Sequence, residues 1–231
     1  MSDPTSFTSG GATIPVEIFR PSDTASTGAI IIAYGSDGLI DTDHGLWKTM
    51  IEGYAKDLAL NGFVTLIPDY FVKTDTHPPI NILTQTGLGT IRSHKGEWQA
   101  TLADAVTFAK GLHGVNGLRI GLLGFSLGGH LCLRLRTIPK VLVEYFAPEL
   151  TLLGGLGTSG PLMLDALIHH GSLDEIDNPE TIMAQLKASG ASVTVINYPS
   201  ASHGFSGSDP HNIDAAAKSK ATTLAFFAEH L

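Results

Sequence analysis

One stretch, GLLGFSLGGH at residues 121–130, places a serine between two glycines at the end of an apolar run. The residues before it (118–125) are typical of a buried strand, and those after it (about 127–136) are typical of a helix. Glycine at 124 and 128 removes side chains that would collide in a tight turn between the two. The stretch therefore predicts a strand–turn–helix unit that lifts Ser126 above a sheet. An ordinary turn, in which the serine caps the helix, is the alternative left open.

The rest of the chain alternates between strand-like and helix-like segments in the same way. Strands are expected at 12–20, 29–34, 63–71, 140–146, 162–170 and 192–198, and helices at 46–61, 97–112, 179–189 and 212–229. Because the segment AIIIAY (29–34) is apolar throughout, it is typical of a central parallel strand covered on both faces. We therefore predict an α/β fold with a mostly parallel central sheet and helices on both faces. The stretch 69–96 lacks clear periodicity, and we expect a lid or a pocket loop there.

The composition of the chain limits the number of domains and the kinds of partner that can be expected. The 231 residues are 43% hydrophobic and 16% charged, and no repeat or linker divides them, so we expect a single domain over 1–231. A net charge of −8 argues against nucleic acid as a partner. The start MSDPTSFTSGG does not resemble a secretion signal, and glycines interrupt the apolar region 150–168. A cytoplasmic protein without a membrane partner is expected, either a monomer or a homodimer.

A serine hydroxyl becomes a nucleophile only beside a base, and the base needs an acid that orients it. After a strand–turn–helix serine, the acid and then the histidine are expected in loops that follow later strands. Asp174 is the first acid in GSLDEID (171–177), 48 residues after Ser126. His203 lies in PSASHGF (199–205), 29 residues further on. These two residues are predicted to complete a catalytic triad with Ser126.

Other residues compete for the same roles. The rivals to Asp174 as the acid are Glu175 and Asp177. The other histidines considered as the base are His130, His169, His170, His211 and His230. His169 and His170 are adjacent on a predicted strand, so their side chains face opposite ways and one of them is expected to be buried.

Main-chain N–H groups are expected to bind the oxyanion that forms when a carbonyl is attacked. One is that of Leu127, at the start of the predicted helix, and the other is that of Ser36 in YGSDG (34–38). The segment DGLIDTDHG (37–45) resembles a calcium loop, but it lacks the spacing and the closing glutamate of an EF-hand. We expect a polar turn there, and no metal or cofactor.

With these residues identified, the chain resembles the dienelactone hydrolase family of the α/β-hydrolase superfamily. The likeness follows five stretches in the order of the family: IIIAYGSDGL, ALNGFVTLIPDYF, GLLGFSLGGHL, HHGSLDEID and INYPSASHGF. The resemblance implies an α/β-hydrolase fold and cleavage of a carboxylic ester or a lactone without a cofactor. It assigns the nucleophile, acid and base to Ser126, Asp174 and His203.

Two positions depart from the founding members of that family. Those members have a cysteine nucleophile where this chain has Ser126, and a glutamate that interacts with the cysteine where this chain has Gly35. The only cysteine here, Cys132, is expected in the core. The founding members bind an anionic substrate through arginines. Arg92 and Lys95 are the possible equivalents here, although the simpler interpretation is that each is a charged side chain exposed to solvent in a loop.

Together these features predict a serine hydrolase that acts through an acyl-enzyme intermediate on a small-molecule ester or lactone. The pocket is expected to be bounded by 69–96, 147–160 and 204–211. A non-catalytic binding protein on a hydrolase scaffold remains an alternative, because fold does not fix function. An acyltransferase or a peptidase with the same triad is another.

Overall fold

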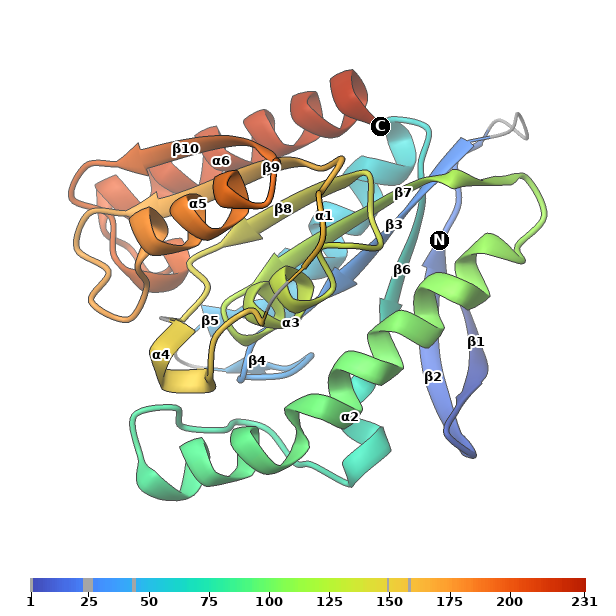
Figure 1. The fold of residues 1–231 in the computed structure, drawn as a ribbon, viewed down its shortest axis with the longest axis horizontal. Helices are drawn as coiled ribbons and strands as arrows, with labels where there is room; N and C mark the ends of the chain where they lie inside the picture. Colours follow the sequence, from blue (N-terminus) through green and yellow to red (C-terminus); the bar gives the residue numbers. More distant parts are fainter. Residues whose placement is uncertain (1, 23–26, 43–44, 149, 158) are drawn as a thin grey trace.

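A computed structural model describes residues 2–22, 27–42, 45–148, 150–157 and 159–231. Eight strands form one sheet in the order β1–β2–β6–β3–β7–β8–β9–β10 (Figure 1). At one edge, β1 (Ser2–Ser9) pairs antiparallel with β2 (Ala12–Phe19), and β2 pairs antiparallel with β6. All the remaining pairs are parallel. The predicted mostly parallel sheet is confirmed.

The parallel strands, apart from β10 at the edge of the sheet and the start of β7, are rich in buried apolar residues, which explains why the sequence reveals them. They are β3 (Thr27–Ala33), β6 (Val64–Pro68), β7 (Val115–Phe125), β8 (Val141–Tyr145), β9 (Asp165–Gly171) and β10 (Ser192–Tyr198). Every residue of β6 and β8 is buried, as expected for strands covered by helices on both faces. The strand predicted at 63–71 ends earlier, at Pro68, because the chain turns there into the 3-10 helix η1 (Tyr70–Thr74).

Helices cover both faces of the sheet, as predicted. In Figure 1, α1 (Trp47–Leu60) and α6 (Pro210–His230) lie behind the sheet, while α2 (Gln85–Lys110), α3 (Leu127–Arg134) and α5 (Pro179–Ala188) lie in front. The short elements are α4 (Leu150–Leu153), η2 (His203–Phe205) and the two-strand pair β4 (Asp41–Thr42) and β5 (Gly45–Leu46). In the described part of the chain, no helix is both long enough and apolar enough to cross a membrane.

Two further segments differ from the sequence prediction. The stretch 69–96 is not a continuous loop, because it contains η1 and the first part of α2, which begins at Gln85 rather than near 97. Thr84 caps this helix with its side chain, which accepts a hydrogen bond from Gly87 N. The helical signal is weak here because three glycines with low helix propensity interrupt it. The other segment is β1, which was not predicted because it is mostly polar and exposed.

The topology brings several loops to one edge of the sheet. Parallel strands end at the same edge, so the loops that follow β3, β7, β9 and β10 all open there. These are the loops that carry Ser36, Ser126, Asp174 and His203. Residues far apart in the sequence can therefore meet in one place.

Candidate active site

Ser126 occupies the tight turn between β7 and α3. Its φ of 50° and ψ of −118° are unfavourable for any residue other than glycine, so the surrounding structure must hold this backbone in place. The neighbouring glycines leave the necessary space. A Cβ atom at position 124 would lie 2.5 Å from Gly128 O, and one at position 128 would lie 2.1 Å from Ala33 O. The turn is therefore possible only with glycine at both positions.

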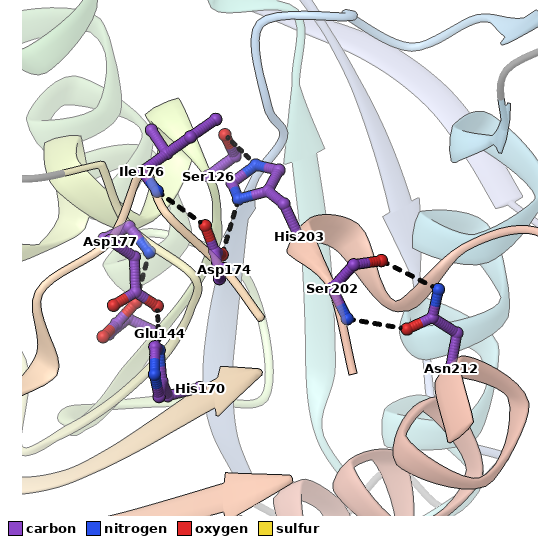
Figure 2. A network of polar contacts seen from close by, with 10 residues as sticks. Ser126, Glu144, His170, Asp174, Ile176, Asp177, Ser202, His203 and Asn212 are labelled. Carbon is purple, nitrogen blue, oxygen red and sulfur yellow. Dashed lines mark hydrogen bonds and ion pairs between the residues drawn. The ribbon is translucent and has the colours of Figure 1, made fainter. Parts of the chain in front are cut away.

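The imidazole of His203 connects Ser126 to Asp174 (Figure 2). His203 Nε2 lies 3.1 Å from Ser126 Oγ, and Nδ1 lies 2.7 Å from Asp174 Oδ2. The Asp174 side chain is fully buried, whereas that of His203 is 31% exposed. The structure thus brings together the three residues that the sequence singles out, in a geometry that suits proton transfer from the hydroxyl to the ring.

The loop after β9 fixes the carboxylate of Asp174. Asp174 N donates to Gly171 O at 2.8 Å, and Asp174 Oδ1 accepts a hydrogen bond from Ile176 N at 2.9 Å. One carboxylate oxygen is therefore held by the loop itself, and the other faces His203. This arrangement fixes the orientation of the Asp174 carboxylate toward the imidazole.

The loop that carries His203 is held by a residue that sequence reasoning missed. Asn212, in the first turn of α6, accepts a hydrogen bond from Ser202 N at 2.8 Å. Its amide group also donates to Ser202 Oγ at 2.9 Å and to Ser206 O at 2.7 Å. Figure 2 shows this clamp directly beside His203. The sequence signal is only an asparagine near a helix start, which usually indicates a cap.

The rival histidines lie elsewhere. His169 is buried between the hydroxyl groups of Tyr198 and Thr223, each 3.0 Å from a ring nitrogen, and burial lowers its pKa to about 3. Burial also lowers the pKa of His130 to about 3. His170 pairs with Asp177, His211 is exposed at the start of α6, and His230 faces Asp165. Of the rival acids, Glu175 is exposed.

Two buried carboxyl groups lie behind Asp174. Asp177 Oδ2 is 2.8 Å from His170 Nδ1, and the Asp177 side chain is 1% exposed. Burial raises the pKa of Asp177 to about 6. Glu144, at the end of β8, is fully buried and its Oε2 accepts a hydrogen bond from Ala147 N at 2.9 Å. Burial, with the nearby Asp177, raises the pKa of Glu144 well above its usual range. The sequence gives no hint of this pair, because Glu144 is hidden in an otherwise apolar strand.

The two predicted oxyanion donors flank Ser126. Leu127 is the first residue of α3, where main-chain N–H groups have no partner within the helix. Ser36 lies in the loop after β3 and lines the same cavity as Ser126. Its neighbour Gly35 approaches Ser126 closely, since a Cβ atom there would be 3.3 Å from Ser126 Cβ.

A cavity of about 410 Å³ opens above Ser126 and His203. Of the segments predicted to bound it, 69–96 contributes residues 79–83 and 204–211 contributes Gly204. The segment 147–160 contributes none of its described residues, so that expectation was wrong; the chain instead approaches the cavity one residue earlier, at Phe146. The sequence also missed the contribution of α1, which supplies Trp47, Met50 and Ile51.

The candidate anion-binding residues do not line this cavity. Arg92 donates to Leu152 O from Nε at 3.2 Å and from Nη2 at 3.0 Å, and Lys95 donates to Leu153 O. Both side chains therefore form hydrogen bonds with the segment that follows β8 rather than with the cavity.

Among the described residues, no cluster of three His, Cys, Asp or Glu side chains could hold a metal ion. In the calcium-like segment, the Asp41 carboxylate accepts hydrogen bonds from the main-chain N–H and the hydroxyl of Thr49 in the first turn of α1, whereas residues 43 and 44 lie outside the described residues.

Comparisons with known proteins agree with this architecture. The model of the dienelactone hydrolase family matches residues 40–231. No curated protein matches the chain. Among solved structures, a dienelactone hydrolase-like promiscuous phosphotriesterase from metagenomic libraries is 20% identical, with a TM-score of 0.75 over 100% of this chain and 98% of that one. An α/β serine hydrolase without a lid from Xanthomonas campestris is 16% identical, with a TM-score of 0.66 over 99% and 94% of the two chains. At these identities the structural likeness establishes the fold.

Proposed function

Since the chain belongs to the dienelactone hydrolase family and is therefore a hydrolase, we propose that it cleaves a carboxylic ester or a lactone with Ser126 as the nucleophile. The observation that carries the proposal is the continuous contact from Ser126 Oγ through His203 to the buried Asp174, at 3.1 Å and 2.7 Å. We also propose that residues 1–231 act as one domain in which residues 79–83 border the pocket.

In the first step, His203 Nε2 takes the hydroxyl proton as Ser126 Oγ attacks the carbonyl carbon. Asp174 accepts a hydrogen bond from His203 Nδ1, which keeps Nε2 free to act as the base and stabilises the imidazolium that forms. Because Asp174 is buried, water does not weaken this interaction.

The N–H groups of Leu127 and Ser36 would bind the developing oxyanion, and one such donor is worth about 3–4 kcal/mol in a well-studied protease. His203 then gives its proton to the leaving alcohol, which breaks the ester bond and leaves an acyl group on Ser126. In the second step His203 activates a water molecule that releases the acid. The lining of the cavity is mostly apolar, including Trp47, Ile51 and Phe146, which favours an uncharged substrate.

The test is the Ser126→Ala variant with 4-nitrophenyl acetate and with a fluorophosphonate probe. We expect turnover and labelling to disappear while the fold, measured by circular dichroism, is retained. The matched control is Ser208→Ala, which removes an exposed hydroxyl from a loop near the site. Turnover that persists in Ser126→Ala would overturn the assignment of the nucleophile. A wild-type protein that the probe does not label would favour the non-catalytic binding protein.

A further inference from the structure

A second cavity, of about 280 Å³, lies next to the one above Ser126. It is formed where α1 and α6 lie side by side on one face of the sheet (Figure 1). Four residues line both cavities: Met50, Phe125, Phe146 and Gly204. The two spaces are therefore separated by a wall no thicker than a single layer of residues.

Small residues on the two helices keep this second space open. Gly53 lies in the middle of α1 and Ala216 faces the same cavity from α6. The backbone of Gly53 is not in the left-handed region, and a Cβ atom there would meet only Lys220 Nζ, at an ordinary contact distance of 3.5 Å. Neither conformation nor crowding thus requires glycine at this position, although glycine weakens a helix. A larger side chain would simply occupy the cavity.

The lining of the second cavity is apolar and carries no uncompensated charge. Aromatic rings, among them Tyr145 and Phe205, form its inner wall. Among the described residues, Lys220 is the only charged one that lines it, and its ammonium group pairs with Asp57 and lies 5.1 Å from the centre of the Tyr54 ring. Such a surface favours an uncharged apolar group over an anion.

We propose that this second cavity is a substrate subsite that takes the apolar end of the acyl chain, and this proposal rests on the proposed function. The substrate class is then an uncharged ester with a medium-length alkyl or aryl acyl group. The chain would reach the subsite past Met50, an unbranched and flexible side chain that can rotate aside. The alcohol is assigned to the opposite side, because it takes its proton from His203, whose side chain is partly exposed to solvent.

Two variants fill the cavity from opposite walls, Ala216→Leu and Gly53→Leu. The measured quantity is the ratio of kcat/KM for 4-nitrophenyl octanoate to kcat/KM for 4-nitrophenyl acetate. We expect this ratio to fall tenfold or more in both variants, since even one methylene group in an apolar pocket is worth roughly 10-fold to 200-fold. The control is Ala225→Leu, which adds the same side chain to an exposed position of α6 and should leave the ratio unchanged. A ratio within twofold of the wild type in both cavity variants would overturn the proposal. So would a selective loss with octyl acetate, since the alcohol would then occupy the subsite.

A second readout does not depend on catalysis. In the Ser126→Ala background, 4-nitrophenyl octanoate should raise the temperature of unfolding with increasing concentration, as any ligand of the folded state does. Adding Gly53→Leu should remove this shift, and a shift that survives the substitution would count against the subsite. If the wild-type protein hydrolyses neither ester but the shift occurs and Gly53→Leu removes it, the proposed function fails, and the second cavity is a binding site for an apolar group without the hydrolysis.

Discussion

The replacement of Asp177 by asparagine should change how the stability of the protein depends on pH. Burial raises the pKa of Asp177 to about 6 from 3.8, and the charge of the nearby Asp174 adds to this effect, while His170 opposes it. In the unfolded chain the carboxyl group loses its proton at the lower pKa. The contribution of Asp177 to the free energy of unfolding therefore falls as the pH rises from about 4 to about 6, and it stays low above pH 6.

The magnitude follows from the size of the shift. A rise from 3.8 to about 6 is about two pH units, and each unit corresponds to 1.36 kcal/mol, which makes about 3 kcal/mol. The side chain is 1% exposed, so solvent screening does not reduce this value much. Asparagine does not titrate, and its amide oxygen can still accept a hydrogen bond from His170. The stability of Asp177→Asn relative to the wild type should thus increase by about 3 kcal/mol between pH 4 and pH 7.

Urea unfolding followed by circular dichroism at pH 4, 5, 6, 7 and 8 measures this difference. The control is Glu175→Gln, which removes a carboxylate from an exposed position of the same loop. For this variant the difference from the wild type should stay nearly constant across the series. The prediction is refuted if the free energy of unfolding of Asp177→Asn minus that of the wild type is the same at pH 7 and pH 4 to within about 0.5 kcal/mol. The pKa of Asp177 would then not be raised in the folded protein.

Three further substitutions test how the proposed site is held. Asp174→Asn should lower kcat/KM for 4-nitrophenyl acetate about 10⁴-fold, because an amide does not hold His203 in the tautomer that accepts the serine proton; a loss of less than tenfold would contradict this role. Asn212→Ala should lower the free energy of unfolding in urea by about 1–3 kcal/mol, because it removes the acceptor of Ser202 N. It should also lower kcat more than it raises KM, whereas unchanged kinetics would show that His203 keeps its place without the clamp. Gly128→Ala should destabilise the fold by about 1–3 kcal/mol or more, because its Cβ atom would lie 2.1 Å from a backbone oxygen; a wild-type melting temperature in circular dichroism would refute this.

The central part of the fold could be predicted because its physical cause is local. Strand β3 and the second half of β7 (120–125) are buried, so their sequences are apolar runs that stand out without any knowledge of their partners. The turn at Ser126 could be predicted as well, since the close approach of backbone atoms excludes every side chain at positions 124 and 128. The loops that bring Asp174 and His203 to it follow from strand order.

Features that depend on distant contacts could not be predicted in this way. The first turns of α2 are interrupted by glycines, and a Cβ atom at Gly87 would lie 1.9 Å from Asn81 O, so packing against the preceding segment decides the residue. Strand β1 is mostly polar, and it forms a strand because it pairs along its whole length with β2. The contribution of α1 to the cavity depends on the angle at which that helix crosses the sheet, which no local pattern encodes.

The residue pair formed by Gly35 and Ser126 shows why the two departures from the founding members belong together. A Cβ atom at position 35 would lie 3.3 Å from Ser126 Cβ and 4.0 Å from its Oγ, so any side chain there would contact Ser126. In the founding members this contact is the one between a glutamate and a cysteine thiol. In the proposed mechanism the hydroxyl of Ser126 instead loses its proton to His203, and a carboxylate beside it would attract that proton and oppose the negative charge that develops on the substrate. Glycine at 35 removes that competing group and leaves His203 as the only base that contacts Ser126 Oγ among the described residues. The serine and the glycine are therefore best understood as one chemical change rather than two.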